Sequence, residues 1–173
     1  MNLSTDGLPA ISLGVDPYGS DIMERPPRKP RESVFNPWIK LYIVVVNIVM
    51  ATVILGAFYL VRAGYPANEL KARTVAFSIM VFSELLRTYT CLSESQPVFK
   101  GGMFKNRFLN VAILSSVILQ FAIIIVPALD FVFDTVRLSV QDWMLIAPLC
   151  FAVFVSGEMS KVVTPKVSKK FLP

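Results

Sequence analysis

Four long apolar runs, separated by polar stretches, constrain the fold of this chain more than any other feature. They cover roughly residues 41–61, 74–92, 109–129 and 143–155. Each approaches the ~20 residues that a helix needs to cross about 30 Å of hydrocarbon. Hydrophobic residues make up 54% of the chain and the mean hydropathy is +0.60, which is typical of a membrane protein. Because a helix satisfies its own backbone in lipid, we predict an all-α, multi-pass integral membrane protein with about four transmembrane helices.

Basic residues are distributed unevenly around these spans, and this predicts the orientation. Twelve of them precede the first span, lie between the second and third, or follow the fourth, while four lie on the other side. Cytoplasmic loops carry an excess of Lys and Arg, so both termini are predicted to be cytoplasmic. The net charge of +5 indicates attraction to anionic lipid headgroups and needs no nucleic-acid partner. The twelve are Arg25, Arg28, Lys29, Arg31, Lys40, Lys100, Lys105, Arg107, Lys161, Lys166, Lys169 and Lys170; the four are Arg62, Lys71, Arg73 and Arg137.

Several kinds of site are excluded by the residue types present. The sequence has no histidine, and its two cysteines, Cys91 and Cys150, lie far apart, so neither a zinc cluster nor a histidine-based catalytic triad can be built. No Gly-rich phosphate-binding loop is present either. We therefore predict no catalytic residue and no cofactor-binding residue, and we assign both thiols to packing.

The first ten residues combine oxygen-bearing side chains with a break in the helix. Asn2 and Asp6 are four residues apart, so on a helix they share one face, with Thr5 beside them. Pro9 lacks an amide donor and, with Gly7, leaves carbonyl groups unpaired, which membrane proteins tolerate where backbone lines an ion path. This combination favours a cation site, although the same residues are also typical of a turn in a polar leader.

Glu84 stands near the middle of the second apolar run. An ionised side chain at that depth costs about 3 kcal/mol, so such a residue usually faces other helices or an ion route. Two interpretations stay open: a cation ligand, or a hydrogen-bonded glutamic acid that holds helices together. Arg87 lies three residues later on the same helical face, where it could pair with Glu84. Glu158 and Lys161 have the same spacing near the end of the last run, and there we favour a structural ion pair.

Five short segments carry a resemblance to a known family. In order, they resemble the sixth membrane helix, the loop after it and the later membrane helices of P-type cation-transporting ATPases of the calcium-pump group. The segment at 84–90 looks most like prokaryotic members of that group. The resemblance covers nearly the whole chain and implies the carboxyl-terminal third of the membrane domain. The segments are NLSTDGLPA at 2–10, GVDP at 14–17, MERPPRKP at 23–30, ELLRTYT at 84–90 and NRF at 106–108.

The resemblance implies a role for four residues. Asn2, Thr5 and Asp6 match the family's ion-coordinating residues on its sixth helix. Glu84 matches the acidic ligand of the eighth helix, which is followed ten residues later by a Ser-Glu pair, here at 93–94. The implied transported ion is calcium or another cation, and no cofactor is expected to bind this chain alone.

The family's catalytic motifs are missing from these 173 residues. A phosphorylated Asp-Lys-Thr-Gly-Thr loop, a Thr-Gly-Glu actuator loop and a nucleotide-binding domain are all needed for the pump reaction, and none is present. The chain alone is therefore expected to have no ATPase activity. Its expected partners are the lipid bilayer and the remaining helices and cytoplasmic domains of a P-type ATPase.

The predicted organisation has four parts. They are the second half of a broken ion-site helix (1–12), a Pro-rich basic cytoplasmic connector (13–40), a four-helix transmembrane bundle (41–161) and a basic cytoplasmic tail (162–173). Because ligand positions stand at the first residues with no span before them, we expect a carboxyl-terminal fragment or a separately encoded remnant of a pump. Two alternatives are a stand-alone four-helix membrane partner or regulator, and a small cation channel with a ring of Glu84 side chains.

Overall fold

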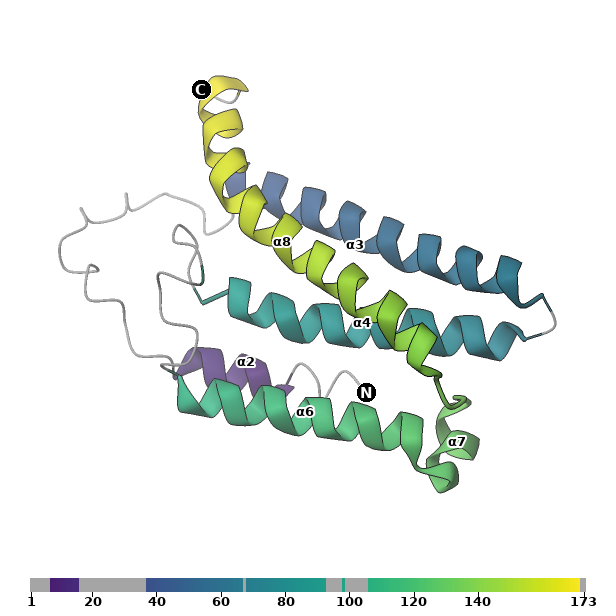
Figure 1. The fold of residues 1–173 in the computed structure, drawn as a ribbon. Helices are drawn as coiled ribbons and strands as arrows, with labels where there is room; N and C mark the ends of the chain where they lie inside the picture. Colours follow the sequence, from purple (N-terminus) through teal and green to yellow (C-terminus); the bar gives the residue numbers. More distant parts are fainter. Residues whose placement is uncertain (1–6, 16–36, 67, 93–97, 99–105, 172–173) are drawn as a thin grey trace.

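The computed structural model describes residues 7–15, 37–66, 68–92, 98 and 106–171 (Figure 1). The regular secondary structure within these ranges is entirely helical, which confirms the prediction of an all-α fold. The helices are α2 (Gly7–Gly14), α3 (Pro37–Gly64), α4 (Glu69–Thr90), α6 (Arg107–Ile125), α7 (Pro127–Phe133) and α8 (Val140–Phe171).

Three segments of these helices are long and apolar enough to cross a membrane. They are Ile39–Gly64 in α3, Arg107–Ile125 in α6 and Val140–Lys161 in α8, and they overlap the first, third and fourth predicted spans. Large apolar side chains on their outer faces are exposed, among them Ile48, Leu55, Leu60, Val111, Leu114, Ile118 and Phe151. Exposed apolar side chains along helices of this length suit hydrocarbon better than water, and they support an integral membrane protein.

The third span ends earlier than position 129, where the sequence placed its end. Val126 leaves helical geometry with φ −84° and ψ 113°, and Pro127 begins the short helix α7. A residue before proline is pushed toward extended backbone because the proline ring crowds it. Pro127 was the sequence signal for this break. The apolar run continues past this proline, which is why the predicted span did too.

Helix α4 lies over the second predicted span but is more polar than α3, α6 and α8. It packs against all three, and most of its residues are buried or half-buried. Ser78 and Ser83 are both 0% exposed. A helix enclosed by other helices can carry polar side chains that a lipid-facing helix cannot. The second predicted span therefore exists as a helix of 22 residues whose composition reflects burial within the bundle.

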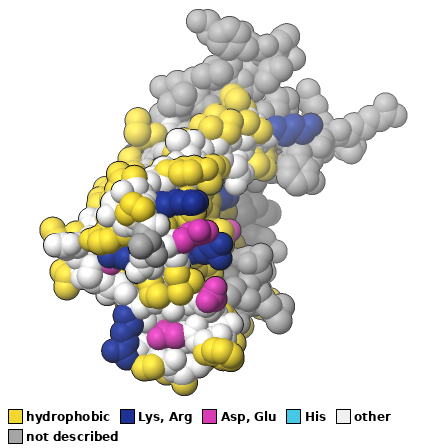
Figure 2. Space-filling model, turned by 90° about the vertical axis from the view of Figure 1, so that its right-hand side faces the viewer, with side chains coloured by type: hydrophobic (Ala, Val, Ile, Leu, Met, Phe, Trp, Pro, Cys, Tyr) yellow, Lys and Arg dark blue, Asp and Glu magenta, His cyan; other side chains and the backbone are white. Residues whose placement is uncertain are grey.

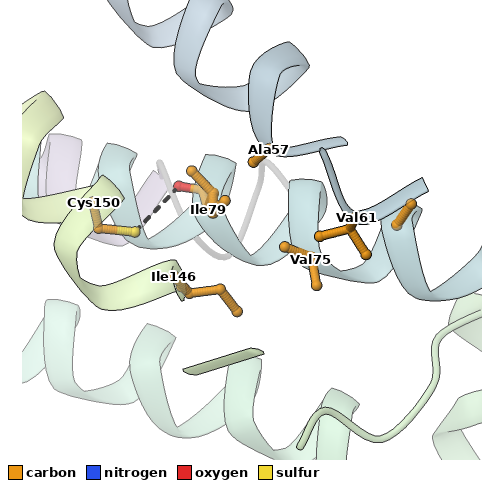
Figure 3. Close-up of a cluster of buried hydrophobic side chains, with 7 residues drawn as sticks. Ala57, Val61, Val75, Ile79, Ile146 and Cys150 are labelled. Carbon is orange, nitrogen blue, oxygen red and sulfur yellow. Dashed lines mark hydrogen bonds between the residues drawn. The ribbon is translucent and has the colours of Figure 1, made fainter. Parts of the chain in front are cut away.

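The bundle is organised around α4. In Figure 1, α3 and α4 run antiparallel, α8 crosses both of them, and α6 lies on the other side of α4 with α2 beside it. One buried cluster joins α3, α4 and α8, and the Cys150 thiol in it lies 3.8 Å from the Ile79 carbonyl oxygen (Figure 3). This confirms the packing role predicted for Cys150, whereas the same prediction for Cys91 is wrong, because Cys91 is exposed at the end of α4. The cluster consists of Ala57, Val61, Ala72, Val75, Ile79, Ile146 and Cys150.

A second buried cluster joins α4, α6 and α8 near the other end of the bundle. Val98, which lies between α4 and α6 in the chain, is buried in it, and Leu13 of α2 packs against it. The Tyr89 hydroxyl donates a hydrogen bond of 2.9 Å to the Asn110 side-chain oxygen, linking α4 to α6. The buried members are Val81, Leu85, Tyr89, Val98, Leu109, Ile113 and Phe154.

Charged side chains gather at the end of the bundle where α3 turns into α4. Figure 2 looks at this end and shows acidic and basic groups among apolar ones. Lys71 and Asp142 form an ion pair at 3.1 Å, and the Lys71 ammonium also lies 4.1 Å from the centre of the Tyr65 ring. The Ser139 amide and hydroxyl both donate to the Asp142 carboxylate, at 2.8 and 2.7 Å. Together they fix the start of α8 against α4.

Candidate cation site

The structure describes one of the four predicted ligands. Glu84 lies in the carboxyl-terminal half of α4 and is half-buried, between Ser83 and Leu85, which are 0% and 2% exposed. Asn2, Thr5 and Asp6 lie outside the described residues. Their convergence with Glu84 therefore stays a prediction, and so do the boundaries of the four predicted parts of the chain.

The helix that follows Asp6 in the sequence is described, and it is built into the bundle. Pro9 and Ser12 of α2 are buried, and the Ser12 hydroxyl donates to the Leu8 carbonyl at 2.7 Å. Figure 1 shows α2 running antiparallel along the first half of α6. Gly7, which follows Asp6 in the sequence, is the first residue of α2.

Arg87 lies one turn beyond Glu84 and places a positive charge inside the bundle. Its Nη1 donates to the Met50 sulfur at 3.5 Å, which is a weak acceptor. Its Nε is buried and has no hydrogen-bond partner in the described part of the chain. The pairing of Arg87 with Glu84 that the spacing suggested stays a prediction. The structure places the guanidinium against α3, a contact that the spacing alone did not reveal.

The predicted pair of Glu158 and Lys161 in α8 is confirmed. The Lys161 ammonium lies 2.8 Å from a Glu158 carboxylate oxygen, and the two side chains are only 4% and 13% exposed. The second Glu158 oxygen accepts a hydrogen bond of 2.9 Å from the Val98 amide. The pair thus joins α8 to Val98, which lies between α4 and α6 in the chain.

Two polar residues on or beside α6 did not emerge from the sequence as important. Gln120 is 0% exposed, and both of its side-chain polar atoms lack a partner among the described residues. Asn106 is 5% exposed and binds two elements at once: its Oδ1 accepts from the Leu109 amide, and its Nδ2 donates to the Ser12 carbonyl, both at 2.9 Å. An Asn before an apolar run is a helix N-cap signal that could have identified Asn106. The contact with Ser12 had no signal, because 94 residues separate the two positions.

Acidic side chains do not cluster around Glu84 in the described part of the chain. The described residues contain no group of three or more Asp, Glu, Cys or His side chains that could hold a metal ion. Calcium takes about six to eight oxygen ligands. A site at Glu84 therefore needs oxygens from other parts of the protein.

Comparisons with known proteins agree on the kind of molecule. The family model described as "Cation transporting ATPase, C-terminus" matches residues 1–163. The calcium-transporting ATPase of Bacillus subtilis is 38% identical over 146 residues, which cover 84% of this chain and 16% of that protein. The calcium-transporting ATPase type 2C member 2 of Rattus norvegicus is 35% identical over 166 residues, or 94% of this chain and 17% of that protein.

A third relative extends the same pattern. Calcium-transporting ATPase 1 of Bacillus cereus is 30% identical over 177 residues, which cover 94% of this chain and 20% of that protein. The chain thus spans 16 to 20% of the length of these three relatives.

Proposed function

This chain belongs to the cation-transporting ATPase family, as a carboxyl-terminal segment of its P-type members, and on that basis we propose that it serves as the last membrane part of an ion pump. Its role there is to complete the cation site and to pack the transport helices. The observation that carries the proposal is the family match over residues 1–163, which includes every predicted ligand. ATP binding and phosphorylation belong to the remaining parts of the pump.

Calcium is the cation we propose, because the relatives are named calcium-transporting ATPases. Asp6 and Glu84 supply carboxylate oxygens, and Asn2 and Thr5 supply neutral ones. Carboxylates offset the charge of the ion after it loses its water, and side-chain oxygens replace part of that water shell. The other oxygens come from regions of the pump outside this chain. We expect this chain alone to bind no cofactor.

The orientation we propose puts both termini in the cytoplasm. At one end of the bundle, α3 and α6 begin and α4 and α8 end (Figure 1). The larger of the two groups of basic residues, which has twelve members, flanks these helix ends in the sequence. The excess of Lys and Arg that is typical of cytoplasmic loops supports the proposal that this end faces the cytoplasm.

The role of Glu84 can be tested by replacing it with Gln in the full-length pump. Glu84→Gln keeps the size and one carbonyl oxygen but removes the charge. We expect the calcium concentration for half-maximal phosphorylation by ATP to rise about tenfold, because the charge of the ligand set tunes calcium affinity. The measurement is a calcium titration of the phosphoenzyme.

Glu69→Gln is the matched control for this experiment. Glu69 is on the same helix, its side chain is 45% exposed, and it pairs only with Arg73 four residues along among the described residues. Exposed pairs of this kind contribute little, so its titration should match that of the wild type. An unchanged half-maximal concentration for Glu84→Gln would contradict the ligand role and favour a structural glutamic acid.

A further inference from the structure

Asn106 joins the start of α6 to the end of α2 through a single side chain. Its Oδ1 caps α6 by accepting from the Leu109 amide at 2.9 Å. An amide N–H can only donate, so this bond fixes which end of the Asn106 side chain is the oxygen. The Nδ2 group then faces the Ser12 carbonyl and donates to it at 2.9 Å. Asn106 is 5% exposed, so water competes little for either bond.

The short helix α2 depends on these contacts for its stability. Eight residues form α2, and isolated helices of that length are unstable in water. Its stability must therefore come from what it packs against. Ser12 lies in its last turn and is 5% exposed, and the next residue, Leu13, packs against the second buried cluster. Figure 1 shows α2 held along α6 rather than among α3 and α8.

We propose that Asn106 is a positioning residue for the cation site, acting through α2. Gly7 begins α2, and consecutive Cα atoms are about 3.8 Å apart, so a shift of α2 along α6 moves the attachment point of Asp6 by the same amount. The bond to Ser12 sets how far α2 can slide along α6. This inference rests on the proposed function, because it assumes that Asp6 binds the transported cation.

The test separates the two bonds of the Asn106 side chain, which are the cap bond to the Leu109 amide and the bond to the Ser12 carbonyl. Asp and Asn are equally good N-caps, so Asn106→Asp keeps an oxygen for the Leu109 amide. The Asp side chain has no N–H to donate to the Ser12 carbonyl, so a carboxylate oxygen would face the carbonyl oxygen and repel it. In the full-length pump, we expect the calcium concentration for half-maximal phosphorylation to rise about tenfold, the effect of losing one well-made buried hydrogen bond. The maximal phosphoenzyme per folded pump should stay near that of the wild type.

Asn68→Asp is the matched control because, within the part of the chain that the structure describes, the Asn68 side chain caps its own helix without bonding to a second helix. Asn68 is the N-cap of α4, where its side-chain oxygen accepts from the Lys71 amide at 3.0 Å. Its calcium titration should match that of the wild type. Asn106→Ser serves as a second variant, since Ser also caps a helix but brings no carboxylate. We expect it to raise the half-maximal calcium concentration as Asn106→Asp does.

Each outcome decides between a cap and a positioning residue. If Asn106→Asp and Asn106→Ser both titrate like Asn68→Asp, Asn106 is only a cap and the inference is wrong. If both variants lower the amount of folded pump without moving the half-maximal concentration, its role is structural and the inference is equally wrong. The proposed function is tested separately by Asp6→Asn. A positioning role for Asn106 can therefore be ruled out while the ligand role of Asp6 still stands.

Discussion

Asp6→Asn in the full-length pump should abolish calcium-dependent phosphorylation at ordinary calcium concentrations. The change keeps the shape of the side chain and removes one negative charge from the proposed ligand set. Calcium affinity follows the number of charged ligands, so we expect the half-maximal calcium concentration to rise about a hundredfold or more. This exceeds the effect expected for Glu84→Gln because Asp6 is expected to bind together with its neighbours Asn2 and Thr5. Calcium titration of the phosphoenzyme measures the change directly.

A control for this result is Asp134→Asn. Asp134 is exposed and lies between α7 and α8, with a positive φ of 52° that Asn also adopts readily. The same chemical change there should leave the calcium titration unaltered. Wild-type phosphorylation in Asp6→Asn would rule out Asp6 as a ligand. Absence of calcium-dependent phosphorylation in the wild-type pump would instead count against the proposed function.

Lys161→Met should strongly destabilise the helix bundle. It removes the only ionic partner that the described part of the chain gives Glu158, whose side chain is 13% exposed. Breaking a buried ion pair from one side typically costs about 3 to 5 kcal/mol, because an uncompensated charge stays behind. We expect the free energy of unfolding to fall by about 3 kcal/mol, since the Val98 amide still donates to Glu158. Denaturant titration of the protein in detergent micelles measures this loss.

Arg73→Met is the matched control for the buried pair. Arg73 also pairs with a glutamate on its own helix, at 2.7 Å from Glu69, but the two side chains are 61% and 45% exposed. Removing an exposed partner should cost less than about 1 kcal/mol. Replacing Glu158 and Lys161 together by Met should recover most of the stability lost by Lys161→Met alone, because no unpaired charge remains. If Lys161→Met and Arg73→Met lowered the free energy of unfolding equally, burial of the Glu158–Lys161 pair would not increase the cost of breaking it.

Features that depend on local sequence could be predicted, and features that depend on distant contacts could not. The apolar runs predicted the helices because crossing a membrane needs length and apolar composition, which are both local properties. The Glu158–Lys161 pair followed from a spacing of three residues on one helix. The bond from Asn106 to Ser12 spans 94 residues, so no local pattern could point to it. The polar composition of α4 is explained only by the packing of α3, α6 and α8 around it.

For the proposed cation site, the sequence suggests candidate residues but not how they are arranged, and their role as ligands stays a prediction. Glu84 drew attention because a charged side chain is costly within an apolar run. The sequence around Glu84 does not indicate which other oxygen atoms would bind the cation together with it. The packing of α2 against α6 likewise needed the structure, because Gly7–Gly14 alone is too short to predict as a stable helix.

The most direct test of the central claim is the native size of the polypeptide that ends in residues 169–173. An antibody against that tail, followed by intact mass measurement, would identify the product in membranes of the source cells. We predict a product several-fold heavier than 19.3 kDa, because this chain spans only 16 to 20% of its relatives. A stable membrane product of 19.3 kDa would contradict the account and point to a separate membrane protein that acts through a partner.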